Sequence, residues 1–164
     1  MTPTLRAGTA GDAAAICAIY NQGIEERIAT FETRLRTPED IEAWFAPGAL
    51  PVVVAEDGGR VLGFASSSAY STRECYNGIR EFSIYVDRTA RGRGLSKLLL
   101  LALSEATVQS GGWKLTSRIF PENAASLEAC RAVGFRVVGT HIRHAKLDGV
   151  WRDVVTVEKL LHQD

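Results

Sequence analysis

The stretch "DRTARGRGLSKLLL", from Asp87 to Leu100, places two glycines two residues apart among three arginines. It follows the run "REFSIYVD", whose alternation is typical of a strand, and it opens a leucine-rich run that predicts a helix over Arg93–Ser110. Exposed N–H groups at a helix N-terminus can bind an anion, and glycine lets the anion approach the backbone. The turn therefore predicts a phosphate site, with a simple change of chain direction as the alternative.

Two familiar phosphate-binding motifs do not fit this turn. A Rossmann fingerprint needs a third glycine where Lys97 stands, and a P-loop needs a longer spacing followed by Lys and Ser or Thr. Arg91, Arg93 and Lys97 nevertheless crowd one turn of a chain in which 19 Lys and Arg balance 19 Asp and Glu. Local positive charge in a neutral chain favours an anion at this place.

The composition bounds the class of protein. A chain of 164 residues predicts a single domain over 1–164. Its balanced charge disfavours nucleic acid or a membrane surface as partner, and no apolar run approaches the ~20 residues of a membrane span. Three widely spaced cysteines predict free thiols in the cytoplasm, and no Cys or His spacing indicates a metal site.

The chain around the turn predicts eleven elements in the order β-α-α-β-β-β-α-β-α-β-β. The predicted strands are Leu5–Ala7, Pro51–Glu56, Arg60–Ser67, Arg80–Asp87, Lys114–Phe120, Phe135–Lys146 and Val150–Leu160. The predicted helices are Ala10–Glu26, one beginning at Pro38, Arg93–Ser110 and Asn123–Ala132. This order predicts an α/β (α+β) domain with a mixed, mostly antiparallel central sheet flanked by helices. Trp151 is expected in its core.

The segment "RTARGRGLS", preceded by "SIYV" and followed by "PENAASLEACRAVGF", resembles the GNAT family of acyl-CoA-dependent N-acyltransferases. The family signature is Arg or Gln, two residues, Gly, one residue, then Gly or Ala; here Arg91, Gly94 and Ser96 stand at those positions, with Ser as a departure. The resemblance spans nearly the whole chain and implies the GNAT fold with acetyl-CoA as cosubstrate. The cofactor-binding residues that it implies are Ile84, Tyr85, Val86, Arg91, Gly92, Arg93, Gly94, Leu95, Ser96, Lys97, Asn123 and Ser126.

Three more segments are similar to the phosphinothricin and arsinothricin N-acetyltransferase branch of that family: "AIYNQGIEERIATFETRLRTPEDIEAWF", "STRECYNGIREFSIYV" and "LDGVWRDV". The resemblance implies acetylation of the α-amino group of such a glutamate-like antimetabolite, with resistance as the consequence, by a homodimer. It implies Glu81 as the catalytic base and Arg73 and Tyr76 as substrate-binding residues. Phe31 lies in the segment that usually covers the acceptor in this fold.

Alternatives stay open for these residues and for the activity. By residue type alone, Glu81 could be a surface carboxylate paired with Arg80, Arg73 a solvated arginine and Tyr76 a packing residue of the loop. The acceptor could instead be methionine sulfoximine or its sulfone, and the chain could be a non-catalytic acyl-CoA sensor. Backbone N–H groups near Ile84 are expected to stabilise an oxyanion. Many relatives protonate the leaving thiolate with a Tyr where this chain has Cys130, which leaves the proton donor open.

Overall fold

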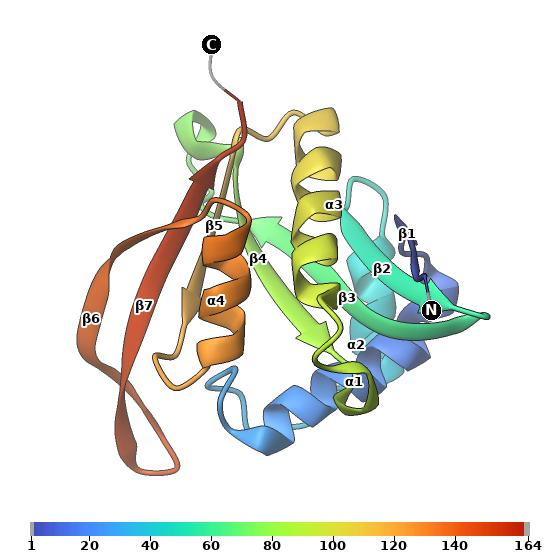
Figure 1. The fold of residues 1–164 in the computed structure, drawn as a ribbon. Helices are drawn as coiled ribbons and strands as arrows, with labels where there is room; N and C mark the ends of the chain where they lie inside the picture. Colours follow the sequence, from blue (N-terminus) through green and yellow to red (C-terminus); the bar gives the residue numbers. More distant parts are fainter. Residues whose placement is uncertain (1, 163–164) are drawn as a thin grey trace.

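The computed structural model describes residues 2–162, which form one sheet with helices on both of its faces (Figure 1). The strands are β1 (Thr4–Ala7), β2 (Val52–Asp57), β3 (Arg60–Ala69), β4 (Ile79–Val86), β5 (Lys114–Ile119), β6 (Arg136–Leu147) and β7 (Val150–Leu160). The α-helices are α1 (Ala13–Glu26), α2 (Pro38–Glu42), α3 (Leu95–Gln109) and α4 (Ala124–Ala132). Short 3₁₀ turns are η1 (Ala10–Asp12), η2 (Ala43–Phe45), η3 (Glu74–Tyr76) and η4 (Arg88–Ala90).

The seven strands lie in the order β1-β2-β3-β4-β5-β7-β6. Every neighbouring pair is antiparallel except β4 and β5, which are parallel. The prediction of a mixed, mostly antiparallel sheet flanked by helices is confirmed, and so is the order of the elements. Among residues 2–162, no helix has both the length and the apolar character needed to cross a bilayer.

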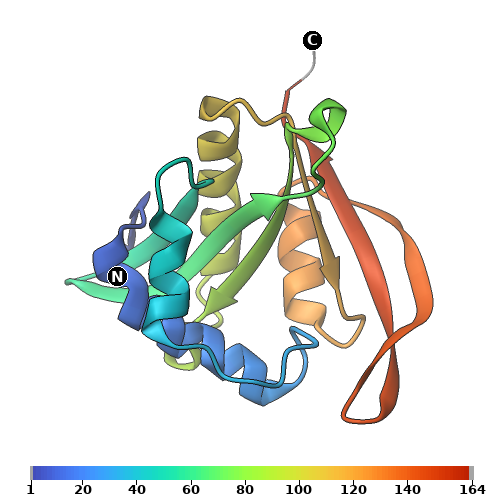
Figure 2. The same ribbon diagram turned by 180° about the vertical axis from the view of Figure 1, so that it is seen from behind.

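Two cores form on the two faces of the sheet. Four leucines of α3 and the end of α4 pack with Phe82 on one face: Leu95, Leu99, Leu100 and Leu103, of which the last three are fully buried. Burial of one such side chain stabilises the fold by about 1.5–3 kcal/mol. Helices α1 and α2 cover the other face around Phe64 (Figure 2). The alternation expected in β4 is confirmed, because Phe82 lies in the first core and Tyr85 packs against the second.

Strands β4 and β5 separate soon after they meet. Their pairing covers only Ile79 to Glu81 with Lys114 to Thr116. At the point of divergence the Ser117 hydroxyl donates to the Phe82 carbonyl over 2.8 Å, which shows that this carbonyl faces β5. Successive residues of a strand direct their backbone groups alternately to the two neighbouring strands, so the N–H of Ile84 also faces the side where β5 has turned away.

Helix α3 begins at Leu95, two residues later than the sequence predicts. Gly92 and Gly94 have φ values of 78° and 76°, a left-handed conformation that excludes them from the helix and that favours glycine. The expectation that Trp151 lies in the core is wrong, since the residue is half exposed near the hairpin end of β7. Its ring stacks under the Lys146 ammonium instead, with the nitrogen 4.9 Å from the ring centre.

Candidate active site

A groove of about 430 Å³ lies at the N-terminal end of α3 and is hereafter the α3 groove. Its walls come from the end of α1, the second half of β4, the glycine turn and the start of α4. Every residue that the sequence assigned to acetyl-CoA lines it except Arg93: Ile84, Tyr85, Val86, Arg91, Gly92, Gly94, Leu95, Ser96, Lys97, Asn123 and Ser126. The fold therefore brings two segments together that lie about thirty residues apart in the chain.

The first turn of α3 presents backbone donors to this groove. Gly94 is the N-cap of the helix, and as a glycine it offers no side chain to accept from the first N–H groups. A Cβ added at Gly92 or Gly94 would meet no atom within 4 Å, so the space in front of the turn is open. The N–H groups of the first turn and the helix dipole can thus meet an anion there.

The Arg91 side chain pairs with a carboxylate of the protein, although its charge alone indicates an anion-binding role. Its guanidinium forms a two-point ion pair with Glu26 at the end of α1, over 2.6 and 2.9 Å. These hydrogen bonds raise the pKa of Arg91 and lower that of Glu26. Arg91 therefore ties the glycine turn to α1, and Lys97 is a second cationic side chain along the groove.

Gly23 and Tyr85 meet on the wall of the α3 groove. A Cβ at Gly23 would lie 2.3 Å from Cε1 of Tyr85, so the ring lies across the helix at a place where only glycine fits. Burial raises the pKa of Tyr85 well above its usual range. The sequence reading missed Gly23 and Glu26, although a glycine inside an apolar helical pattern is a signal of close packing.

The start of α4 closes the groove on the far side. Asn123 is the N-cap of α4, and its side-chain oxygen accepts from the N–H of Ser126 over 3.3 Å. Both residues line the α3 groove. The capping bond fixes the first turn of α4 beside the first turn of α3, so two helix N-termini face the same space.

A second hollow, of about 490 Å³, contains Glu81 and is hereafter the Glu81 cavity. The Glu81 carboxylate accepts from Arg118 of β5 over 3.1 Å and is not paired with Arg80. Arg80 is buried on the other face of the sheet and donates to Ser110 and to the Asn77 carbonyl. Glu81 is thus oriented from the neighbouring strand while part of its surface stays accessible in the cavity.

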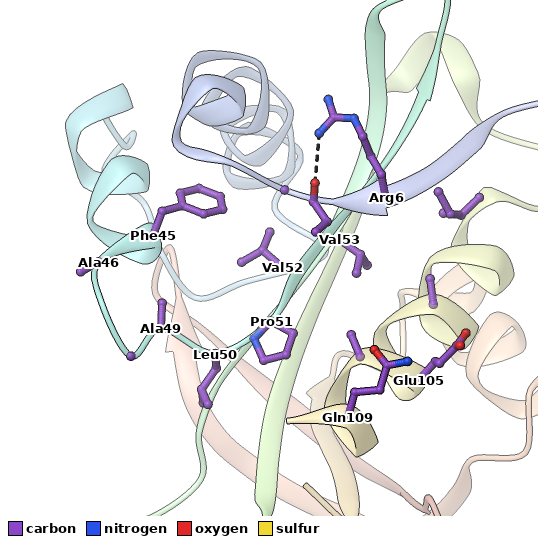
Figure 3. A pocket seen from close by; sticks show the side chains of 16 residues that line it. Arg6, Phe45, Ala46, Ala49, Leu50, Pro51, Val52, Val53, Glu105 and Gln109 are labelled. Carbon is purple, nitrogen blue, oxygen red and sulfur yellow. Dashed lines mark hydrogen bonds between the residues drawn. The ribbon is translucent and has the colours of Figure 1, made fainter. Parts of the chain in front are cut away.

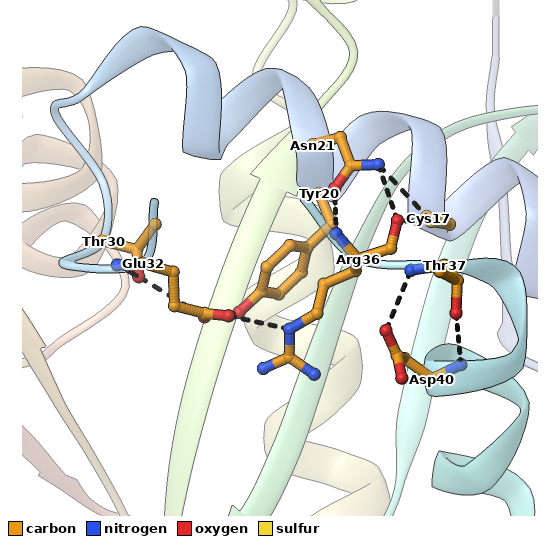
Figure 4. Close-up of polar contacts among 8 residues, drawn as sticks. All are labelled: Cys17, Tyr20, Asn21, Thr30, Glu32, Arg36, Thr37 and Asp40. Atoms are coloured by element: carbon orange, nitrogen blue, oxygen red, sulfur yellow. Dashed lines mark hydrogen bonds and ion pairs between the residues drawn. The ribbon is translucent and has the colours of Figure 1, made fainter. Parts of the chain in front are cut away.

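The segment after α1 forms one side of the Glu81 cavity. Phe31 lines it and packs edge-on against Phe120, with ring centres 4.7 Å apart. Glu32 also lines it, and its carboxylate accepts from the Tyr20 hydroxyl and from Arg36, the latter over 2.7 Å (Figure 4). Burial and the bond to Glu32 raise the pKa of Tyr20. His144 of β6 also lines this cavity.

The two hollows adjoin each other. Tyr85 and Ala29 line both the α3 groove and the Glu81 cavity. Their common boundary runs along the half of β4 that β5 leaves unpaired, where the N–H of Ile84 is directed. A ligand in the groove and a second molecule beside Glu81 would meet at this boundary.

Arg73 and Tyr76 stand apart from these walls. They lie on the loop between Ala69 of β3 and Ile79 of β4, at the same end of the strands as the cavity, but neither lines it. The Arg73 guanidinium lies 5.4 Å from the centre of the Tyr76 ring. Both side chains are exposed, so they are available to a molecule that extends beyond the cavity.

Cys130 is not placed to donate a proton to the groove. Its thiol is buried in the core beneath α4, burial raises its pKa to about 12, and it lines neither the α3 groove nor the Glu81 cavity.

Within residues 2–162, no group of three or more His, Cys, Asp or Glu side chains could hold a metal ion.

A hollow of about 590 Å³ lies away from this site, between β1, the segment before β2 and the C-terminal half of α3 (Figure 3). It shares no lining residue with the α3 groove or the Glu81 cavity. Arg6 at its edge is held by Asp12 and Glu56, at 2.9 and 3.0 Å. The hollow is therefore separate from the cavity that contains Glu81.

The candidate site thus combines a helix N-terminus with open donors, a splayed pair of strands and an adjoining carboxylate. The acetyltransferase (GNAT) family model matches residues 18–135, more than half of the chain. The chain belongs to the GNAT acetyltransferase family.

Relatives named for two different acceptors match this chain over nearly its whole length. The chain is 33% identical to the L-methionine sulfoximine/L-methionine sulfone acetyltransferase of Pseudomonas aeruginosa, covering 96% of this chain and 94% of the relative. It is 30% identical to the phosphinothricin N-acetyltransferase of Streptomyces coelicolor, covering 96% and 95%. A solved phosphinothricin acetyltransferase of Sinorhizobium meliloti in complex with acetyl-CoA superimposes with a TM-score of 0.90, at 30% identity over 98% of this chain and 89% of that one.

Proposed function

We propose that this protein transfers the acetyl group of acetyl-CoA to the α-amino group of a glutamate-like antimetabolite, phosphinothricin or arsinothricin, and so confers resistance. The observation that carries the proposal is the meeting of the α3 groove and the Glu81 cavity at Tyr85 and Ala29. The groove fits acetyl-CoA, since its N–H donors and Lys97 suit a pyrophosphate and its wall of β4 suits an extended pantetheine. The relatives named above support both the donor and an amino-acid-like acceptor.

Each chemical step has a residue beside the boundary. Glu81 takes a proton from the acceptor ammonium, and the free amine then attacks the thioester carbonyl. The N–H of Ile84 stabilises the oxyanion, to which one such donor contributes typically ~3 kcal/mol. The attacking nitrogen gives up its second proton, the carbon–sulfur bond breaks and the thiolate of CoA takes up a proton, so that an N-acetyl amino acid and free CoA form. Cys130 is buried elsewhere and does not take part.

Residues other than the proposed base Glu81 bind the side chain of the acceptor. Phe31 covers the acceptor beside Glu81. Arg73 and Tyr76 contact the head of the acceptor side chain, because a planar guanidinium suits a phosphinate or arsinate. Arg73 is already positioned by the ring of Tyr76. Acetylation removes the ammonium charge that such a compound needs in order to pass as glutamate.

The test is a release assay for free CoA with phosphinothricin, arsinothricin, methionine sulfoximine and methionine sulfone side by side. We expect the highest kcat/KM with phosphinothricin or arsinothricin. A preference for methionine sulfoximine or methionine sulfone, the acceptors in the name of the Pseudomonas relative, would show that one of these compounds is the acceptor and not phosphinothricin or arsinothricin. Release with none of them would leave the alternative of a non-catalytic acyl-CoA sensor.

The base is tested separately. We expect Glu81→Gln to lower kcat by about 100- to 10,000-fold near neutral pH, because a positioned general base contributes about that much. The affinity for acetyl-CoA should stay nearly the same, since Glu81 does not line the α3 groove. Glu105→Gln, an exposed carboxylate on α3, is the matched control. Full activity of Glu81→Gln would disprove the assignment.

We also propose that the protein is a homodimer that pairs through its β6–β7 hairpin. β6 is an edge strand, and the hairpin exposes six large apolar side chains: Val137, Val138, Ile142, Val150, Trp151 and Leu160. An exposed apolar edge of this kind is unfavourable in a monomer.

Location in the cytoplasm stays a prediction, supported by the three free cysteines.

A further inference from the structure

A branch of the Glu81 cavity is not used by the reaction described above. This hollow of about 510 Å³, the serine branch, lies between β3, β4 and the segment around Arg36 and Trp44. It shares Tyr20, Ser68 and Ser83 with the Glu81 cavity, so the two adjoin. A molecule whose amine lies at Glu81 can therefore extend a second group into the branch.

Three hydroxyl groups form the floor of the branch. Ser66 pairs with Ser83 across β3 and β4, and Ser68 pairs with Glu81, so all four side chains lie on one face of the sheet. Among residues 2–162, none of the three serine hydroxyls has a hydrogen-bond partner, whereas the Ser67 hydroxyl donates to the Pro51 carbonyl over 2.6 Å. The floor beside the proposed base thus offers three unused donors.

Arg36 forms a cationic wall over this floor. Its backbone is fixed by Asn21, whose amide donates to the Arg36 carbonyl and accepts from the Arg36 N–H, over 3.1 and 2.9 Å. Its guanidinium lies 5.3 Å from the centre of the Tyr20 ring and donates through Nε to Glu32 over 2.7 Å (Figure 4). Nη1 and Nη2 have no partner within residues 2–162, and the residue lines the serine branch.

We propose that Arg36 and the hydroxyls of Ser66, Ser68 and Ser83 bind the α-carboxylate of the acceptor. This inference rests on the proposed function. Phosphinothricin and methionine sulfone have different side-chain heads, but both carry an α-ammonium and an α-carboxylate on one carbon. A site for the shared carboxylate must therefore lie next to the base, as the serine branch does. The two free nitrogens of Arg36 form the planar fork that carboxylates favour.

The assignment separates the roles of two arginines. Arg36 recognises what all α-amino acid acceptors share, and Arg73 on the loop after β3 recognises the side-chain head, in which they differ. Glu32 holds the guanidinium of Arg36 in place through Nε and is a positioning residue.

The experiment measures kcat/KM for L-phosphinothricin and L-methionine sulfone, each beside its own α-carboxamide, with the wild type and with Arg36→Ala, Ser83→Ala and Arg34→Ala. Each variant is compared with the wild type on the same compound, because an α-carboxamide also changes the pKa of its amino group. We expect Arg36→Ala to lower kcat/KM for the acids by about 10- to 100-fold through KM, the usual effect of a lost charge-assisted hydrogen bond. The value for the carboxamides should change much less, because a neutral amide gains much less from a guanidinium than a carboxylate does.

The other variants keep the test independent of folding. Ser83→Ala removes an exposed hydroxyl without a partner, and we expect a several-fold loss with the acids alone. Arg34→Ala, an exposed arginine on the same segment, should leave all four values unchanged. The inference would be overturned if Arg36→Ala and Ser83→Ala both lowered kcat/KM equally for acid and carboxamide, or if neither variant lowered it. In either case, acetylation by the wild type would still support the proposed function. A wild type that acetylates no α-amino acid would overturn both.

Discussion

At the scale of single residues, the site depends on contacts that exclude other side chains. Gly23 leaves room for the Tyr85 ring, and that ring belongs to both the α3 groove and the Glu81 cavity. Tyr85 also packs on Tyr20, with ring centres 5.0 Å apart, and Tyr20 holds Glu32. The size of residue 23 therefore affects both substrates at once.

We expect Gly23→Ala to destabilise the fold by about 1–3 kcal/mol, as overpacking of a filled space does, and to raise KM for acetyl-CoA and the acceptor together. The reason is the 2.3 Å approach of the new Cβ to the ring, which must shift. Urea unfolding and initial rates measure both effects. Gly11→Ala is the matched control, because its new Cβ meets only Thr9 Oγ1 at 3.5 Å. If the two variants behave alike, the ring does not constrain the groove.

At the scale of elements, one carboxylate collects several of the contacts that hold the turn from β4 to α3. Asp87 accepts from the backbone and side chain of Thr89, from Gln22 of α1 and from Arg60 of β3. The bond from the Thr89 hydroxyl leads the contributions that lower the pKa of Asp87 to about 2. A carboxyl group with a lowered pKa in the folded state stabilises that state above its unfolded pKa, and this stabilisation is lost as the pH falls through the folded pKa.

We expect Asp87→Asn to lower the free energy of unfolding at pH 7 by about 2 kcal/mol, from a pKa difference of about two units. The gap between variant and wild type should shrink as the pH falls from about 4 toward about 2, where the wild type protonates Asp87. Urea unfolding at a series of pH values measures it. Asp57→Asn, at the exposed end of β2, serves as the control and should show no such gap. A gap that is constant over this range would contradict the account.

The elements and much of the groove could be predicted from the sequence, because they depend on local patterns. Alternation in β4, the glycine turn and the Asp148-Gly149 hairpin, with φ values of 50° and 77°, all act over a few residues. The partners of charged side chains could not be predicted. Arg91 pairs with Glu26 and Glu81 with Arg118, and both contacts join segments that only the tertiary fold brings together. The early end of the β4–β5 pairing has no sequence signature either.

At the scale of the whole molecule, the β6–β7 hairpin extends from the sheet as an edge with little cover (Figure 1). The part of the hairpin near its turn takes part in the Glu81 cavity through His144, and His144 stacks on His141 with ring centres 4.4 Å apart. Pairing of two hairpins would therefore bury apolar surface close to the proposed acceptor site.

We expect Ile142→Glu to shift the protein from dimer to monomer in analytical ultracentrifugation, because Ile142 is 69% exposed and a charge is unfavourable inside an apolar interface. Val108→Glu, on the exposed side of α3, is the control and should leave the mass unchanged. A wild type that sediments as a monomer at all concentrations would refute the dimer.

The short boundary between the α3 groove and the Glu81 cavity also has a kinetic meaning. Because their linings have only Ala29 and Tyr85 in common, one substrate can occupy its place while the entrance for the other stays free. We therefore expect the acetyl group to pass directly between two bound molecules, without an acetylated enzyme. Double-reciprocal plots at several fixed acceptor concentrations should accordingly intersect, and a family of parallel lines would point to a covalent carrier instead.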